Sequence, residues 1–163
     1  MGYIDNVMKG VKTSHARSPG GSLRRSETNP PRRILVVEDD TLLLRLNAEV
    51  LLHSGYEVDT AADGAAAWQA LNANHYDLMI TDNSMPEISG VELLAKLRAA
   101  QMSLPVIMAT GTLPDEDLTQ YPRLQPDAML LKPYTLEEMV KTVQKVLNEV
   151  ASAAFTACSS MQR

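Results

Sequence analysis

The sequence lacks the features of secreted, membrane-spanning and metal-cluster proteins. Its single cysteine, Cys158, cannot form an internal disulfide, and no group of Cys and His residues has the spacing of a zinc site. No apolar run approaches the ~18 to 20 residues of a membrane helix. The N-terminus lacks the apolar core of a signal peptide. These absences favour a soluble protein of the reducing cytoplasm that does not act at a membrane.

Aromatic residues and basic residues are also scarce in most of the chain. Aromatics make up 4% of the 163 residues and hydrophobic residues 45%, so one domain with an aliphatic core is expected. Residues 1–33 hold seven Lys or Arg against two acids, whereas residues 34–163 hold eight against eighteen. An acidic domain is a poor candidate for binding nucleic acid, whose phosphate backbone requires clustered positive charge.

Composition divides the chain into three parts. Ser, Gly, Pro, Thr and basic residues dominate up to Pro31, so residues 1–31 are expected to form a disordered basic leader. Regular apolar patterns cover residues 32–150, which we predict to be the folded domain. We expect residues 151–163 to be a helix end that frays into a C-terminal tail. No second domain is expected after this tail, so any output would depend on contacts with other proteins.

Short aliphatic runs alternate with longer amphipathic ones, which is typical of an α/β fold with a parallel sheet. Strands are predicted at residues 33–38, 56–61, 78–81, 105–109 and 128–131. Helices are predicted at residues 41–53, after Asp63-Gly64, after Ser89-Gly90, and from a Thr135–Glu138 capping box to about Val150. A further helix near residues 115–118 should be short, because Pro122 and Pro126 interrupt it.

Acidic residues stand at the ends of two predicted strands. Glu38 and Asp39 follow the first strand, and Asp82 follows the third. In open parallel sheets the ligand crevice lies outside the carboxyl ends of the strands, so these carboxylates should meet there. Three neighbouring carboxylates repel one another unless a cation or protons join them. We therefore predict a Mg²⁺ site with Asp39 and Asp82 as direct ligands, the backbone carbonyl of Ser84, and Glu38 acting through water.

A carboxylate beside Mg²⁺ can also act as a nucleophile and form an acyl phosphate, and Asp82 is the predicted nucleophile. Transfer of a phosphoryl group to Asp82 requires stabilisation of the charge on three phosphoryl oxygens. Mg²⁺ would cover one oxygen and the ammonium group of Lys132 another. The hydroxyl of Thr110 would cover the third. Thr110 stands at the end of the fourth predicted strand, and Lys132 follows the fifth. Both should therefore lie at the same edge of the sheet as Asp82.

Over about residues 32–150 the chain resembles the receiver domain of two-component response regulators. The motifs that carry the resemblance are residues 34–39, residues 82–86 with Gly90, residues 109–111 and residues 132–134. The resemblance implies a flavodoxin-like (βα)5 fold, doubly wound, with five parallel strands in the order 2-1-3-4-5. It also implies a phosphorelay partner, a phosphohistidine on a sensor histidine kinase or phosphotransfer protein. Such a domain catalyses its own phosphorylation and dephosphorylation, but is primarily a signalling switch.

The chain departs from the family at Met129, where receivers usually carry an aromatic residue. An aromatic rotamer switch is therefore unavailable, although a thioether packs into varied gaps, and an altered face near Met129 and Tyr134 is expected to carry the signal. An alternative is a degenerate receiver that works as an interaction or dimerisation module without phosphorylation. The downstream protein and a homodimer are left open. A phosphatase of the haloacid-dehalogenase type is disfavoured, because Glu38-Asp39-Asp40-Thr41 lacks the required Asp-x-Asp-x-Thr/Val.

Overall fold

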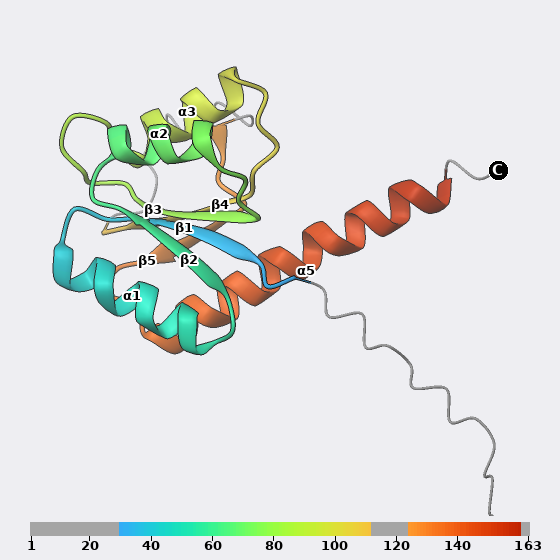
Figure 1. Cartoon of the computed structure of the whole chain (residues 1–163), viewed down its shortest axis with the longest axis horizontal. Helices are drawn as coiled ribbons and strands as arrows, with labels where there is room; N and C mark the ends of the chain where they lie inside the picture. The colour runs from blue at the N-terminus through green and yellow to red at the C-terminus, as the bar shows by residue number, and fades with distance from the viewer. Residues whose placement is uncertain (1–29, 112–123, 161–163) are drawn as a thin grey trace, which may run out of the picture.

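The computed structural model describes residues 30–111 and 124–160, without the side chains of residues 154–160 (Figure 1). The leader expected at residues 1–31 lies almost wholly outside the described residues. The short helix expected near residues 115–118 lies outside them too. Among the described residues, no helix combines the length and the apolar character needed to cross a membrane.

Five parallel strands form one sheet in the order β2-β1-β3-β4-β5, which confirms the predicted flavodoxin-like fold. The strands are β1 (Arg33–Val37), β2 (Glu57–Ala61), β3 (Leu78–Asp82), β4 (Val106–Thr110) and β5 (Ala128–Leu131). Each boundary lies within one residue of the sequence-based prediction. The register pairs Asp82 with Ala109, so β3 and β4 reach the same edge of the sheet together.

In the part of the chain that the structure describes, four helices pack around the sheet, and capping side chains set their starts. They are α1 (Thr41–His53), α2 (Gly64–Ala73), α3 (Gly90–Ala99) and α5 (Leu136–Ser160). Ser89 and Glu92 form a capping box at α3. Thr135 and Glu138 form the predicted one at α5, where the backbone N–H of Glu138 donates to the Thr135 hydroxyl at 3.2 Å.

The last helix extends to Ser160, whereas the sequence analysis expected it to fray after about Val150 into a tail over residues 151–163. Residues 136–160 contain no glycine or proline that would stop the helix, and alanine, the strongest helix former, is frequent after Val150. This extension runs away from the body of the domain (Figure 1). Val150 is already 42% exposed, so the apolar contact with the sheet ends near Leu147.

The core has two layers because every central strand is buried on both faces. Ile34 and Val36 of β1 pack with α1 and α5, while Leu35 and Val37 pack with α2 and α3. Figure 1 shows the two helix pairs on opposite faces of the sheet. Strands buried on both sides need continuous apolar runs, which explains why the sequence shows runs rather than alternation. The largest fully buried side chains are aliphatic or methionine, as the low aromatic content predicts.

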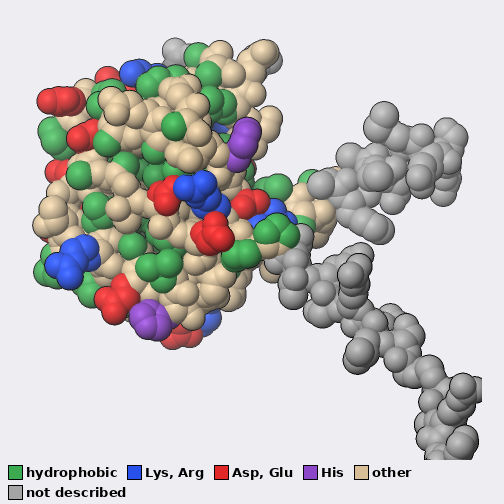
Figure 2. Space-filling view, viewed as in Figure 1, with side chains coloured by type: hydrophobic (Ala, Val, Ile, Leu, Met, Phe, Trp, Pro, Cys, Tyr) green, Lys and Arg blue, Asp and Glu red, His purple; other side chains and the backbone are tan. Residues whose placement is uncertain are grey.

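Two aspartates, each just before a strand, fix the start of the strand beside it, at the end of the sheet opposite the predicted site. Asp77 accepts a hydrogen bond from the backbone N–H of Arg33 at 2.8 Å, and Asp127 accepts one from Val106 at 2.8 Å. Asp77 also pairs with Arg32 at 2.7 Å. The space-filling view shows acidic and basic side chains next to one another on the face that it displays (Figure 2). These bonds fix how the strands are aligned with one another, and therefore where their carboxyl ends lie.

The capping box of α5 gives a pH-dependent prediction. Hydrogen bonds from the backbone N–H and the hydroxyl of Thr135 lower the pKa of Glu138 below its ordinary value of 4.5. A lowered pKa in the folded state means that the stabilisation is present above pH 4.5 and is lost as the pH falls through the folded-state pKa. Glu138→Gln should therefore differ in stability from the wild type mainly above pH 4.5, and the gap should close below it.

Urea unfolding followed by circular dichroism at several pH values would measure this gap. Glu137→Gln is the matched control, because it removes the same charge one position earlier, where the side chain pairs with Lys141 instead of capping the helix. Equal pH-dependent gaps in the two variants would contradict a capping role for Glu138.

Candidate functional site

Three consecutive acids follow β1, and the structure gives them different surroundings. Asp40 is the N-cap of α1 and accepts hydrogen bonds from the first backbone N–H groups of that helix. Glu38 is 3% exposed, so its side chain is turned into the domain, whereas Asp39 is exposed. Only Glu38 and Asp39 are thus left to face the carboxyl edge of the sheet.

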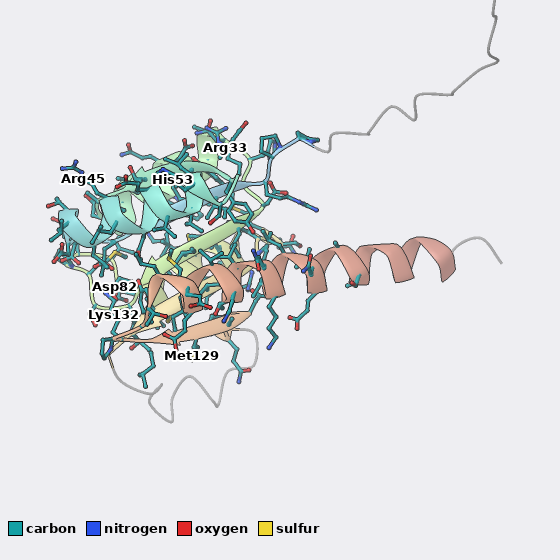
Figure 3. The ribbon with its side chains drawn as sticks, turned by 90° about the horizontal axis from the view of Figure 1, so that it is seen from below. Arg33, Arg45, His53, Asp82, Met129 and Lys132 are labelled. Atoms are coloured by element: carbon teal, nitrogen blue, oxygen red, sulfur yellow. The ribbon has the colours of Figure 1, made fainter. Side chains whose placement is uncertain are left out.

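Asp82 and Lys132 form the centre of the site. Asp82 is the last residue of β3 and is 5% exposed. The ammonium nitrogen of Lys132 lies 3.1 Å from Asp82 Oδ2 and 2.9 Å from Glu38 Oε2. Figure 3 shows Asp82 and Lys132 close together at one end of the sheet. The other oxygen, Asp82 Oδ1, is buried and has no hydrogen-bond partner among the described residues.

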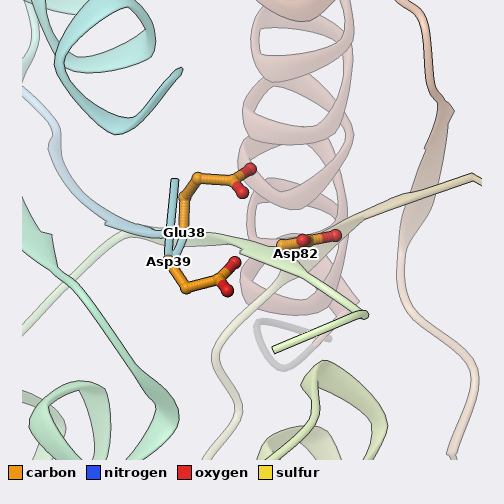
Figure 4. A group of neighbouring side chains, drawn as sticks. All are labelled: Glu38, Asp39 and Asp82. Atoms are coloured by element: carbon orange, nitrogen blue, oxygen red, sulfur yellow. The ribbon is translucent and has the colours of Figure 1, made fainter. Parts of the chain in front are cut away.

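The carboxylates of Glu38, Asp39 and Asp82 form a group with the chemistry of a hard-cation site. One oxygen from each lies within 4.8 Å of the others. Figure 4 shows Glu38 and Asp39 coming from the end of β1 and Asp82 from the end of β3. Among the described residues, one ammonium group stands against three carboxylates, which leaves an excess of negative charge, and one buried oxygen, Asp82 Oδ1, has no partner. All-oxygen donors in this arrangement fit Mg²⁺, which binds one or two carboxylates together with water.

The charges of the cluster shift the pKa values of two of its members. Burial raises the pKa of Glu38, and the hydrogen bond from Lys132 offsets this only in part, while the charge of Asp82 adds to it. For Lys132, burial lowers the pKa, but the hydrogen bonds to Glu38 and Asp82 outweigh burial and raise it above 10.5. Lys132 is therefore a fixed positive charge at neutral pH, held by the field of the acids.

The backbone around the site is tightly packed. The N–H of Lys132 donates to the carbonyl oxygen of Thr110 at 2.7 Å, which ties β4 to the residue after β5. After β3, the side chain of Asn83 accepts a hydrogen bond from the N–H of Val91 at 3.2 Å. A Cβ atom added at Gly90 would overlap the carbonyl oxygen of Asp82, so only glycine fits there. The start of α3 is thus packed directly against the backbone of Asp82.

The predicted site residues lie at the ends of four strands and in the loop after β3. Glu38, Asp39, Asp82 and Lys132 come together in one cluster. Thr110 is 4% exposed and ends β4, the strand between β3 and β5, so it lies at the same edge. Ser84 is exposed in the loop two residues beyond Asp82.

Two further residues concern β5 and the segment that follows it: Met129, which the sequence analysis singled out, and Asn47, which it missed. Met129 is 37% exposed on β5, an edge strand of the sheet. Asn47 on α1 was missed, although a polar residue on the buried face of an amphipathic helix is a usable signal. Its side-chain N–H donates to the hydroxyl of Tyr134 at 3.0 Å. Burial raises the pKa of Tyr134.

The comparisons with known proteins agree with this geometry. The family model described as "Response regulator receiver domain" matches residues 34–144. The transcriptional regulatory protein RprY of Bacteroides fragilis is 34% identical over 118 residues, which are 72% of this chain and 50% of RprY. The CheY-like receiver domain protein of Methanospirillum hungatei is 28% identical with a TM-score of 0.70, covering 76% of this chain and 98% of that one.

A third similar protein was solved as a complex. The response regulator TrrA of Thermotoga maritima, in complex with Mg(2+)-BeF, is 31% identical with a TM-score of 0.61, covering 71% of this chain and 98% of that one. The chain described above belongs to the response regulator receiver family. It spans about half or less of the length of the first curated relatives that it matches.

Proposed function

We propose that Asp82 accepts a phosphoryl group from a phosphohistidine of a sensor histidine kinase or phosphotransfer protein, in a Mg²⁺-dependent reaction that switches protein contacts. The observation that carries this proposal is the state of the Asp82 carboxylate. It is 5% exposed, one oxygen is held by Lys132, and the other is buried without a hydrogen-bond partner among the described residues. An unpartnered buried carboxylate oxygen is unfavourable unless it serves a ligand or a reaction.

Asp39 and Asp82 would hold Mg²⁺ directly, with Glu38 acting through water and Ser84 through its backbone carbonyl. The bound ion would neutralise charge on one phosphoryl oxygen. Support comes from the oxygen-only donor set within 4.8 Å and from the similarity to TrrA, which was solved with Mg(2+)-BeF. Asp39 is the exposed member of the group, so its carboxylate can exchange water for a cation without unfolding of the domain.

In the transfer step, a carboxylate oxygen of Asp82 forms a bond to phosphorus as the phosphorus–nitrogen bond of phosphohistidine breaks. The electron pair of that bond stays on the imidazole, which takes up a proton, and Asp82 becomes an acyl phosphate. Lys132 turns its ammonium group from the free carboxylate towards a phosphoryl oxygen, and the hydroxyl of Thr110 donates to another. Attack by water later returns the carboxylate of Asp82 and releases inorganic phosphate.

The output is proposed to depend on the face near Met129 and Tyr134. Met129 is 37% exposed on an edge strand, so a partner protein can contact it. Tyr134 follows Lys132 by two residues, and movement of Lys132 towards a phosphoryl group would be transmitted along this short segment.

The test is intact-mass spectrometry after incubation with acetyl phosphate, with and without Mg²⁺. We expect the wild type to gain one base-labile phosphoryl group only with Mg²⁺, and Asp82→Asn to gain none. Glu137→Gln, which removes an exposed carboxylate of α5 that pairs with Lys141, is the control and should be labelled like the wild type.

Labelling of Asp82→Asn at another residue would refute the assignment of Asp82. No labelling of the folded wild type under any condition would instead favour the degenerate receiver that acts without phosphorylation. Circular dichroism of each variant would show that a lost label does not result from unfolding.

A further inference from the structure

One buried polar residue has no role in the proposed reaction. Among the described residues, the buried polar or charged ones are Glu38, Asn47, Thr81, Asp82 and Thr110. Three of these belong to the site itself. The hydroxyl of Thr81 donates to the carbonyl oxygen of Asp82 at 3.0 Å, so it supports the site. Asn47, which is 1% exposed on α1, is the one that has no evident connection with the site.

Asn47 occupies a position where an apolar residue would pack better. Its neighbours on the buried face of α1 are Leu44, Ala48 and Leu51. Its side-chain N–H donates to the hydroxyl of Tyr134 at 3.0 Å, but its carbonyl oxygen is buried without a partner among the described residues. A half-satisfied buried amide is less favourable for stability than an apolar side chain of the same shape. Stability alone therefore does not account for asparagine at this position.

The partner of Asn47 connects it to the ammonium group at the site. Tyr134 follows Lys132 by two residues, and Thr135 then begins the capping box of α5. Lys132 stands at the end of β5, with β4 between it and Asp82 on β3. The backbones of Lys132 and Asp82 are therefore about two strand spacings apart, roughly 10 Å, and the two side chains together with the 3.1 Å contact between them cover this distance. A shift of the Lys132 backbone would therefore change the distance between its ammonium group and Asp82.

We infer that Asn47 and Tyr134 are positioning residues for Lys132. Their hydrogen bond ties α1 to the segment that follows β5, and this holds the backbone of Lys132 where its ammonium group contacts both Asp82 at 3.1 Å and Glu38 at 2.9 Å. The kinetic consequence rests on the proposed phosphorylation of Asp82. The effect on the Lys132 ammonium group does not.

The experiment uses the double variant Asn47→Leu/Tyr134→Phe, which removes the hydrogen bond and nearly keeps the shapes. Its resistance to urea should equal or exceed that of the wild type, because no buried amide is left half-satisfied. Its rate of phosphorylation by acetyl phosphate should fall by about tenfold, since a misplacement of about 1 Å can cost about 10²-fold. Leu51→Ala, on the same buried face of α1, should show the reverse pattern, with lower stability and an unchanged rate in the folded protein.

A second readout is independent of phosphorylation. Labelling of lysines with acetic anhydride, followed by peptide mass spectrometry, reports how firmly each amine is held by its partners. In the double variant, labelling of Lys132 should rise relative to Lys141, an exposed lysine that serves as the internal standard. The rate loss should also vanish when both proteins carry Lys132→Ala.

The outcomes separate the two proposals. If Lys132 is labelled equally in the wild type and the double variant, the positioning role is overturned, whatever the phosphorylation rates are. A rate loss that persists in the Lys132→Ala background would overturn it as well. If the wild type takes up no phosphoryl group but labelling of Lys132 rises in the double variant, the proposed function fails and the positioning role stands.

Discussion

Replacing Lys132 by alanine is expected to lower the free energy of unfolding by about 3 kcal/mol in the absence of divalent cations, because it leaves buried carboxylates without their cation. The side chains of Glu38 and Asp82 are only 4% and 6% exposed, so water compensates only in part for the lost ammonium group. The raised pKa of Glu38 shows that its charged form is already disfavoured with Lys132 present. Removal of Lys132 would raise that pKa further.

Mg²⁺ should restore part of the lost stability in Lys132→Ala, since a divalent cation at the carboxylates supplies the missing positive charge. We expect the increase in stability on adding Mg²⁺ to be larger in the variant than in the wild type, where Lys132 and the ion share the same acids. Urea unfolding of both proteins, once with EDTA and once with Mg²⁺, measures the gain in stability that Mg²⁺ gives to each.

The matched control is Lys141→Ala, which removes a lysine from an exposed ion pair with Glu137. The two side chains are 69% and 75% exposed. Exposed pairs of this kind contribute between about 0 and 1 kcal/mol, so this variant should unfold almost like the wild type and respond to Mg²⁺ as the wild type does. A similar loss in both lysine variants would contradict the view that Lys132 neutralises a buried cluster.

Most of the sheet and of the carboxylate cluster could be predicted from the sequence because both depend on strand ends. Each apolar run marks a strand that is buried on two faces, and a parallel sheet brings all carboxyl ends to one edge. Asp82 and Lys132 follow such runs, so their meeting at 3.1 Å follows from the topology. The end of α5 could not be located, since neither glycine nor proline stops that helix before Ser160.

Interactions between distant residues were beyond the reach of local patterns. Asn47 and Tyr134 are 87 positions apart, and nothing near either residue indicates the other. The sequence around the three consecutive acids after β1 also does not indicate which of them binds a ligand and which caps the helix. The structure shows that Asp40 is the N-cap of α1. The role of a side chain depends there on the direction in which the backbone turns after the strand, which only the packed fold defines.

Gly90→Ala is expected to destabilise the domain by about 2 kcal/mol, because overpacking against a rigid neighbour usually costs about 1–3 kcal/mol. The added Cβ would overlap the carbonyl oxygen of Asp82 and would lie 3.0 Å from the Cα of Asn83. These are backbone atoms, so no side-chain rotation relieves the contact. Any relief would have to move the backbone of Asp82, and we expect phosphorylation by acetyl phosphate to slow by about tenfold or more.

The sign of the stability change in Gly90→Ala distinguishes overpacking against Asp82 from the effect of helix propensity. Gly90 opens α3, and helix propensity alone predicts that alanine would stabilise a helix by up to about 1 kcal/mol. Gly111→Ala is the control for an added methyl group, since a Cβ at Gly111 meets nothing within 4 Å. Urea unfolding of both variants decides between the two effects. A more stable Gly90→Ala that is phosphorylated at the wild-type rate would show that α3 can move away from Asp82 without disturbing the carboxylate, and that the close packing is not needed to place it.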